Sequence, residues 1–557
     1  MVRASRLRLA GVAMVIALGL VAAACGTNSP ASDATPDGTI SRANRDVVES
    51  AEKPKLGGKL VYALNSETNG WNPATNQWAP PGLIVSRAIF DTLTAYDDQS
   101  QVKPFLAESF SSNADFTEWT FKLRPGVKLH NGKPVTADVV VRNQTYLSKS
   151  PITGPAYKYA GVKEITRKDD LTFTVSLSRG SAVYPIAFAT QLGVVADPDW
   201  LESNDSLEPI GTGPFAMDRW EIGNRLTVKK NPNYWRTDAD GTRMPYLDSV
   251  EFRMIPDNDA RGKALQAKDV DVIQTFAGQQ VVDFQQQSAS GLQIFSDTKG
   301  ESREQMVMLN TMVKPLDDPD ARLALAYATD KKTYSEVVTG GFNEVANGPV
   351  SPSSPWYTPT EYPQYDPVKA KELVDKVKAR NGGTFAFTLQ GIADPETQQG
   401  VQVLQSQWQA VGIEVKADLQ EQAKAIIGVV AGSYEAVVWS QFDAPNPFAD
   451  GVWWDPELAV PPPEFTLNFA RNKDPEILDA LVKGTGTADL ATQKQAMAAV
   501  QKRLAADVPY VWLNHLRQTL IASPRVVNLV NWTLPDGTKG LDMNQGGHPL
   551  TQVWMRS

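Results

Sequence analysis

Residues 119–139 read WTFKLRPGVKLHNGKPVTADV. The first five residues alternate between apolar and polar side chains, which is the pattern of a half-buried strand. Gly126 and Gly132 follow this strand and suit turns that need a positive φ angle. No cluster of Cys, His or carboxylate residues with metal-ligand spacing lies near His130, so we expect this histidine, like His515 and His548, to be structural. The stretch therefore predicts a strand and turns of the protein scaffold.

The rest of the chain contains short predicted strands with predicted helices among them. Strands are predicted at 59–64, 171–177, 226–229, 249–255, 413–419 and 436–440, and helices at 320–330, 367–378 and 489–506. Because 38 prolines and 39 glycines interrupt these elements, the pattern favours a protein of several lobes. The mixture of helices and strands predicts an α/β or mixed α+β fold class.

The amino terminus has the features of an export signal. Three arginines precede an uncharged apolar run over residues 9–24, which predicts a signal peptide over residues 1–24. Three alanines lead directly into Cys25, the only cysteine of the chain, and this ending resembles a lipobox. The resemblance implies that Cys25 receives a lipid group and holds the protein to the outer face of the cell membrane. The alternative is an ordinary secretory signal with an incidental free thiol.

Composition and charge describe the part beyond the signal. Residues 25–56 begin with the cysteine and are rich in Ser, Thr, Asn, Asp and Pro, which predicts a flexible tether. About 530 residues follow the signal, enough for two or more lobes. No second stretch of about 18 apolar residues predicts a further membrane span. Removing the three leader arginines from the net charge of −9 leaves −12 without long like-charge runs, which argues against nucleic acid as a partner.

Further motifs follow residues 119–139 in a fixed order along the chain. They are Gly211-Thr212-Gly213-Pro214-Phe215, Asn231-Pro232-Asn233-Tyr234-Trp235, Asp320 with Arg322, Ala324-Leu325 and Asp330-Lys331, Tyr365-Asp366-Pro367 with Ala370-Lys371, and Asp507-Val508-Pro509-Tyr510. Together these motifs resemble family 5 of the extracellular solute-binding proteins, the peptide- and nickel-binding type that serves ABC importers. The resemblance covers nearly the whole body of the chain.

This resemblance implies a type II fold like that of periplasmic binding proteins, with two α/β lobes, a hinge, a ligand cleft and a small inserted domain. The expected limits are 57–95, 207–305 and 515–557 for the first lobe, 96–206 for the inserted domain, and 306–514 for the second lobe. The family further implies a monomer that is not an enzyme and needs no cofactor or metal. Such a protein captures an oligopeptide or a related solute by hinge closure and delivers it to the permease of the importer.

The cleft is expected beside residues 440–448, because ligands of open α/β sheets bind beyond the carboxyl ends of strands. In peptide-binding members of the family, an aspartate near the start of this segment holds the α-ammonium group of the peptide. That position falls on Gln441 here, and a neutral amide provides no charge, although charge-assisted bonds are about twice as strong as neutral ones. Asp443 is one candidate to take over the role. The alternatives are that Asp443 caps a turn before Pro445, or that the ligand is a blocked peptide or a saccharide.

Several tryptophans near Gly, Pro or Asn are further candidates for ligand contact, because flat rings suit sugars as well as peptide side chains. A position in the hydrophobic core is equally consistent with each of them. The predicted cleft residues are Trp71, Trp356, Trp439, Ser440, Gln441, Asp443, Asn446 and Trp454.

Two other classes of function compete with solute capture. A lipoprotein of the same fold that regulates envelope synthesis by binding proteins predicts a blocked or shallow cleft. An envelope hydrolase is disfavoured, because the body has no Gly-x-Ser-x-Gly elbow, no cysteine and too few histidines for a zinc hydrolase.

Overall fold

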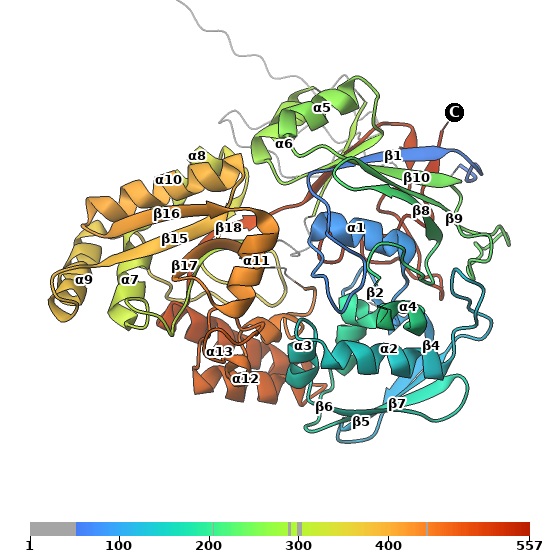
Figure 1. Cartoon of the computed structure of the whole chain (residues 1–557), viewed down its shortest axis with the longest axis horizontal. Coiled ribbons are helices and arrows are strands. Elements are labelled where there is room, and N and C mark those ends of the chain that lie inside the picture. The colour runs from blue at the N-terminus through green and yellow to red at the C-terminus, as the bar shows by residue number, and fades with distance from the viewer. Residues whose placement is uncertain (1–51, 204, 288–290, 298–302, 442–443, 557) are drawn as a thin grey trace, which may run out of the picture. The chain divides into compact units, whose positions relative to one another are not determined.

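The computed structural model describes residues 52–203, 205–287, 291–297, 303–441 and 444–556 (Figure 1). The predicted signal peptide, Cys25, most of the predicted tether and Asp443 lie outside these residues. Helices pack on several sheets in the described part, which confirms the predicted mixed α/β fold class. Within these ranges, no helix has the length and apolar character that crossing a bilayer requires.

The first sheet has seven strands. Their order is β12 (Gln293–Ser296), β19 (Thr519–Ala522), β11 (Val272–Thr275), β1 (Lys59–Leu64), β10 (Ser249–Met254), β9 (Arg225–Lys230) and β8 (Phe215–Glu221). Strand β1 runs parallel to both of its neighbours, and the other pairs are antiparallel. Leu83, Ile84 and Ala88 of helix α1 (Pro80–Ile89) pack in one apolar cluster with Leu60 and Tyr62 of β1. Helices α5 (Asn258–Gln266) and α6 (Gly278–Gln286) flank β11 in the chain.

The second sheet has six strands and is built from later residues. Their order is β14 (Glu344–Val345), β18 (Tyr510–Leu516), β13 (Arg303–Leu309), β17 (Ala436–Gln441), β15 (Ala386–Ile392) and β16 (Glu414–Gln420). Its helices are α7 (Pro319–Ala328), α8 (Lys331–Thr339), α9 (Pro367–Arg380), α10 (Pro395–Ala410), α11 (Gln422–Ala431), α12 (Pro475–Thr485) and α13 (Leu490–Asp507). Val307 and Leu309 of β13 pack with α7, α9 and α10, whereas Met306 and Met308 pack with α12 and α13. The alternation of β13 therefore separates two cores on opposite faces.

The chain passes between the two large sheets at two places. It leaves the first sheet after β12 and enters the second at β13, and it returns between β18 and β19. The expected lobe limits at 305/306 and 514/515 fall inside β13 and β18, which both belong to the second sheet. The lobe limits and the hinge between the lobes stay a prediction.

A third sheet of four antiparallel strands lies within residues 107–177. Its order is β4 (Ala107–Ser112), β5 (Glu118–Leu123), β7 (Thr172–Leu177) and β6 (Val162–Arg167). Helix α2 (Ala137–Lys149) packs Val140 against Phe121 and Phe173 of this sheet. The remaining short elements are α3 (Gly154–Tyr159), α4 (Pro198–Glu202), β2 (Thr94–Tyr96), β3 (Val102–Pro104), β20 (Val526–Val527) and β21 (Trp554–Met555).

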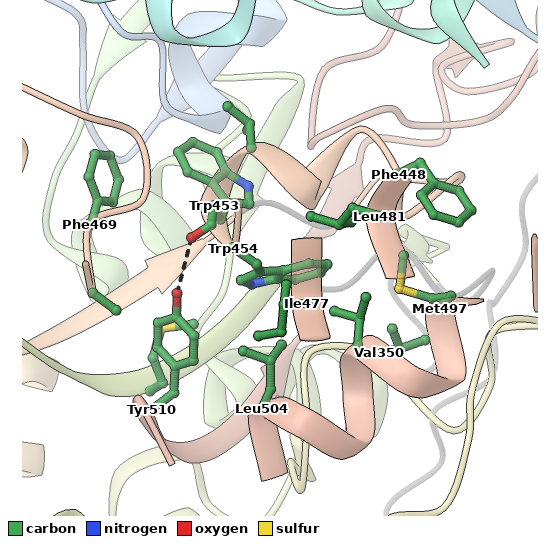
Figure 2. Close-up of a cluster of buried hydrophobic side chains, with 14 of the residues drawn as sticks. Val350, Phe448, Trp453, Trp454, Phe469, Ile477, Leu481, Met497, Leu504 and Tyr510 are labelled. Carbon is green, nitrogen blue, oxygen red and sulfur yellow. Dashed lines mark hydrogen bonds between the residues drawn. The ribbon is translucent and has the colours of Figure 1, made fainter. Parts of the chain in front are cut away.

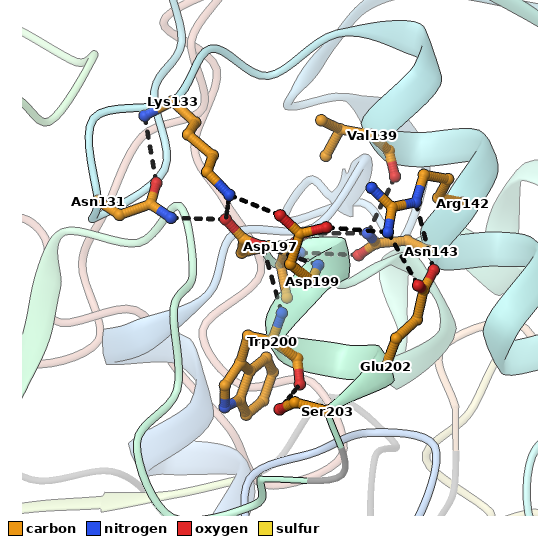
Figure 3. A network of polar contacts seen from close by, with 11 residues as sticks. Asn131, Lys133, Val139, Arg142, Asn143, Asp197, Asp199, Trp200, Glu202 and Ser203 are labelled. Atoms are coloured by element: carbon orange, nitrogen blue, oxygen red, sulfur yellow. Dashed lines mark hydrogen bonds and ion pairs between the residues drawn. The ribbon is translucent and has the colours of Figure 1, made fainter.

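Residues 119–139 form scaffold, as their pattern predicts. Strand β5 occupies the expected position, and Gly126 and Gly132 have φ angles of 78° and 84°. The Gly211 amide donates to Nδ1 of His130 at 3.1 Å, and Nε2 of the same ring lies 3.1 Å from the Gly213 carbonyl, so this histidine joins two motifs. Lys133 binds Asp197 at 3.0 Å and Asp199 at 2.8 Å, which fixes the turn to α4 (Figure 3).

The three predicted helices correspond to α7, α9 and α13. The prediction for the first runs two residues too far, because Asp330 begins the next helix. Its side chain accepts hydrogen bonds from the amides of Lys332 and Thr333 and caps α8. Asp489 and Asp366 cap α13 and α9 in the same way.

Candidate functional site

A cluster of aromatic side chains lies on the α12–α13 face of the second sheet. We call it the tryptophan cluster and define it as Trp356, Phe448, Trp453, Trp454, Phe469 and Tyr510. Figure 2 shows five of these rings, those of Phe448, Trp453, Trp454, Phe469 and Tyr510, beside Ile477 and Leu481 of α12 and Met497 and Leu504 of α13. The Tyr510 hydroxyl donates to the carbonyl of Trp453 at 3.4 Å, which links β18 to the loop after β17.

The tryptophan cluster also receives side chains from segments that lie before β13 and after β18 in the chain. Tyr96, Val183, Ile186, Ala189 and Leu541 belong to the same continuous apolar core. Polar contacts accompany them: the Tyr159 hydroxyl donates to the Phe448 carbonyl at 2.7 Å, and Arg179 pairs with Glu457 at 3.1 Å. Segments on both sides of the two crossings therefore meet at this cluster.

The structure brings together most of the predicted cleft residues. Trp356 and Trp454 lie in the tryptophan cluster, and Trp439 packs against it with its ring 6.0 Å from that of Phe469. Ser440 and Gln441 end strand β17 next to Trp439. Asn446 accepts a hydrogen bond from the Phe448 amide at 3.1 Å, so its side chain shapes the following turn.

Trp71 lies apart from these residues. It is 2% exposed and packs in the core of the first sheet, with ring centroids 6.3 Å from Trp78 and 5.6 Å from Trp220. The cavity beside it measures only about 20 Å³. The sequence left open whether Trp71 contacts the ligand or belongs to the hydrophobic core, and its packing favours the core.

Gln441 has a carboxylate as its direct neighbour across the sheet. In the antiparallel register of β13 and β17, Gln441 is the partner of Glu304, just as Trp439 is the partner of Met306. Gln441 and Glu304 therefore project from the same face, and they are 3% and 4% exposed. Gln441 lies close enough to the Tyr510 hydroxyl to act on its pKa, which places this pair at the edge of the tryptophan cluster, and the amide nitrogen of Gln441 has no hydrogen-bond partner within the described residues.

A second carboxylate, Asp450, lies close to Glu304. It accepts a hydrogen bond from the Ala444 amide at 2.8 Å, and the nearby indole of Trp453 acts to lower its pKa. Burial raises the pKa of Asp450 to about 8, and burial together with the charge of Asp450 raises the pKa of Glu304 well above its usual range. Arg303 opposes this effect on Glu304 only in part. The pair therefore holds a proton at neutral pH unless a cation enters.

Arg303 and Glu396 extend the charged region. The Arg303 guanidinium lies 4.8 Å from the Phe276 ring, and burial lowers its pKa to about 10. Burial raises the pKa of Glu396 to about 7, and the negative charge of Asp394 acts in the same direction. The region thus offers the buried carboxyl groups of Glu304 and Asp450, and a half-buried carboxyl group and guanidinium, to a ligand.

Buried polar atoms without hydrogen-bond partners occur on strands near both crossings. Both amide atoms of Gln274 on β11 lack a partner, as do the side-chain oxygens of Asn514 on β18, Gln518 between β18 and β19, and Asn544. Each of these side chains is buried or nearly so. Leaving such an atom unpaired costs about 1–3 kcal/mol. A set of this kind is typical of a site where a bound molecule supplies the missing partners.

Sequence reasoning missed Glu304, Asp450 and Gln274. Each is a polar residue close to an apolar run, and no motif distinguishes it from a surface residue. Only the strand register places Glu304 against Gln441, and only the fold of the loop brings Asp450 to it. Among the described residues, no group of three His, Cys, Asp or Glu side chains is arranged to hold a metal ion.

Comparison with known proteins identifies the family. The family described as bacterial extracellular solute-binding proteins, family 5 Middle, matches residues 101–457. The chain belongs to this family. The glutathione-binding protein GsiB of Pectobacterium atrosepticum is 26% identical over 465 residues, which cover 81% of this chain and 87% of that protein.

Solved structures agree on the fold. AgaA of A. tumefaciens R10, solved with agropinic acid, has a TM-score of 0.78 at 23% identity and covers 90% of this chain and 99% of that one. The oligopeptide-binding protein AppA of Bacillus subtilis, solved with a nonapeptide, has a TM-score of 0.76 at 23% identity, with 91% and 100% covered. The fold is therefore that of type II periplasmic binding proteins.

Family membership fixes the general role. This family 5 protein is a substrate-binding protein of an ABC importer and is not an enzyme. It binds a small solute and works with the permease of its importer. The family description places its members outside the cytoplasm.

Proposed function

We propose that this family 5 protein is a lipid-anchored receptor for a peptide or peptide-like solute that carries a free amino group. The solute binds between the two large sheets, and the lobes close around it by bending at the β12–β13 and β18–β19 crossings. The closed, loaded form then delivers the solute to the permease. Cys25 carries the lipid that keeps the receptor near the membrane, and the receptor works as a monomer.

One observation carries the choice of an amino group: Glu304 lies directly opposite Gln441. From the family resemblance we expect Gln441 at the position of the aspartate that holds a peptide's α-ammonium group, and Glu304 on the neighbouring strand β13 offers a carboxylate on the same face. An ammonium group that contacts Glu304 gains a charge-assisted hydrogen bond, which is about twice as strong as a neutral one. Its positive charge also offsets the repulsion that arises when Glu304 and Asp450 ionise, so binding displaces the proton that the pair otherwise retains.

The relatives support a peptide-like solute. GsiB is named for glutathione, and AppA was solved with a nonapeptide. The tryptophan cluster suits the apolar side chains of such a ligand, since aromatic rings bury large areas. The unpartnered amide of Gln274 and the unpartnered side-chain oxygens of Asn514 and Gln518 suit its backbone, which carries one donor and one acceptor at most residues.

Calorimetry on the full chain tests the proposal. Peptides of two to five residues would be titrated with a free and with an acetylated amino terminus. We expect the free form to bind at least about tenfold more tightly, which corresponds to about 1.4 kcal/mol. Glu304→Gln should remove this preference, whereas Glu414→Gln, an exposed residue on β16, should keep it.

Three results would count against parts of the proposal. Equal binding of free and acetylated peptides would exclude an amino-group site. If saccharides stabilise the protein and no peptide does, the solute is a saccharide and not a peptide. A protein partner that co-purifies while no small solute binds would favour the regulatory alternative. The anchor is tested separately, because Cys25→Ser should release the protein from the membrane fraction.

A further inference from the structure

A basic pocket lies away from the tryptophan cluster, in two segments that the sequence assigned to the scaffold. Its volume is about 530 Å³, and its lining residues are Arg124, Pro125, Gly126, Lys128, Asn233, Trp235 and Arg243. Arg124 to Lys128 form the turn after β5, and Asn233 and Trp235 form the turn after β9. The pocket therefore lies where the four-stranded sheet meets the edge of the first sheet.

The walls of this basic pocket are held in place by named contacts. The indole of Trp235 donates to Asp91 at 2.8 Å, and the guanidinium of Arg124 lies 5.5 Å from the Trp235 ring. The Arg124 Nε donates to the Phe105 carbonyl at 2.6 Å, and Arg243 donates to the Tyr234 carbonyl at 3.0 Å. Both arginines use one nitrogen for these contacts, so the rest of each guanidinium is available to a ligand.

The positive charge of the basic pocket is not balanced by ion pairs. Within the described residues, none of Arg124, Lys128 and Arg243 lies within ion-pair distance of a carboxylate. Glu108 and Asp536 act on Arg124 from farther away, but Glu108 is paired with Lys122 at 2.7 Å. Arg236, buried beside Trp235, adds a further positive charge behind the wall. A concave site with several such cations favours an anion, in a chain whose net charge is −9.

The described part of the chain begins next to this basic pocket. Lys53 pairs with Asp240 at 3.3 Å, and Lys53 and Pro54 line a cavity with Asp238, Asp240 and Thr242. Arg243 follows directly on the same loop. Residues 26–51 connect this point to Cys25. If Cys25 is lipidated, the surface around residues 53 and 243 is the one at which the anchoring chain leaves the body.

We propose that the basic pocket binds the phosphate group of an anionic lipid in the membrane that holds the protein. Arg124 and Arg243 contact the phosphate oxygens through paired N–H groups, Lys128 adds a third charge, and Trp235 lies beside the glycerol part of the headgroup. Together with the anchor, this contact gives the body a preferred orientation on the bilayer. The inference rests on the proposed lipid anchor and is independent of the solute.

Amine labelling of the full chain in vesicles tests this contact. The protein would be reconstituted into vesicles of phosphatidylcholine alone or with added phosphatidylglycerol, and the labelling of each lysine would be read by mass spectrometry. We expect anionic vesicles to lower labelling of Lys128 by about fivefold, the effect of roughly one cation near a charged membrane. Lys416, exposed on β16, serves as the internal reference and should not change.

Variants and competitors decide between the possible results. Arg243→Glu should abolish the protection of Lys128, and Arg243→Lys should retain most of it. Both should melt only slightly below the wild type, because Arg243 is exposed and its side chain makes a single hydrogen bond among the described residues, to the Tyr234 carbonyl. Equal labelling in the two kinds of vesicle overturns the proposal. Protection by inorganic phosphate in neutral vesicles, at concentrations equal to the lipid phosphate, assigns the pocket to a free phosphate and overturns the lipid.

The same experiment separates this inference from the lipid anchor. If the protein fails to stay on neutral vesicles, the anchor fails. Protection of Lys128 on anionic vesicles would still support the pocket in that case. If the protein stays on both kinds of vesicle without protection of Lys128, the anchor stands and the pocket proposal fails.

Discussion

Arg322 on α7 donates a hydrogen bond of 2.6 Å to the carboxylate of Asp507, at the end of α13. Both residues belong to motifs by which the chain resembles its family, although they are far apart in the sequence. Arg322 also donates to the carbonyls of Asp507 and Leu316, each at 3.0 Å, and is 4% exposed. The arginine therefore joins the helices on the two faces of the second sheet.

Replacing this arginine should destabilise the second sheet and leave the ligand site intact. Arg322→Met removes four hydrogen bonds and leaves buried carbonyls unpaired, so we expect a loss of about 2–3 kcal/mol in the free energy of unfolding. Unfolding followed by calorimetry measures this loss in the free energy of unfolding. Arg380→Met is the matched control, since Arg380 pairs with Asp318 and Asp320 on the surface and should have a much smaller effect. Equal losses would contradict the assignment.

The buried carboxyl of Asp450 should make stability depend on pH. Its pKa is about 8 in the folded protein against an ordinary value of 3.8, so between these values the unfolded chain releases a proton that the folded protein keeps. The free energy of unfolding should therefore fall as the pH rises from about 4 to about 8, by at most about 1.4 kcal/mol per pH unit. Glu304, whose charge faces Asp450, adds to this trend.

Asp450→Asn isolates this effect. The amide oxygen still accepts the hydrogen bond from Ala444, but the side chain no longer titrates. Melting temperatures should be measured from pH 4 to pH 9 without solute. We expect the melting temperature of the variant to rise relative to that of the wild type as the pH increases. Parallel curves for the two proteins would mean that Asp450 ionises normally. Glu396 and Asp91 titrate in both proteins and cancel in the comparison.

Much of the scaffold could be predicted from the sequence, because its signals are local. The alternation at Trp119–Leu123 predicts β5, and the prolines and acidic caps at the starts of α7 and α9 mark those helices. The family motifs carry the remaining information on the fold. The end of the predicted helix at 330 was wrong because the Asp330 cap starts a new helix within the same apolar pattern.

The candidate site was less predictable, because its parts come from distant strands. Trp356 and Trp454 lie together in one buried apolar cluster with Trp439 packed against it, whereas Trp71 satisfied the same criterion and lies in the separate core of the first sheet. Nothing near Glu304 in the sequence indicates that it faces Gln441. That relationship depends on antiparallel register, which is set by the packing of a whole sheet.

The two kinds of tryptophan predict different effects on binding. Trp439→Ala should weaken solute binding by about tenfold, because a half-buried ring beside Gln441 loses its contact with the ligand. Trp71→Phe should lower the melting temperature and leave the affinity unchanged, since Trp71 packs only within the first core. Calorimetric titration with the peptide that binds most tightly measures the affinity of both variants, and thermal unfolding measures their melting temperatures. A loss of affinity in Trp71→Phe alone would place the site on the first sheet.

The hydrogen bond from Tyr159 to the Phe448 carbonyl should favour closure of the lobes. It joins α3 to the loop after β17 at 2.7 Å, and Gly451 on the same loop lies against the Tyr159 hydroxyl so closely that an added Cβ would be 2.1 Å from it. Removing the hydroxyl in Tyr159→Phe should cost closure about 1 kcal/mol and weaken solute binding about fivefold. Small-angle scattering without solute should show a larger radius of gyration.

Tyr157→Phe is the control for this closure contact. Tyr157 lies on the same helix, but its hydroxyl donates to Gln144 on α2 at 2.7 Å, within the domain of the four-stranded sheet. Its loss should lower stability without changing the radius of gyration or the affinity. If both variants weaken binding equally, the effect comes from damage to α3. If neither does, the Tyr159 contact forms only after the lobes have closed for other reasons, and the ligand alone provides the energy of closure.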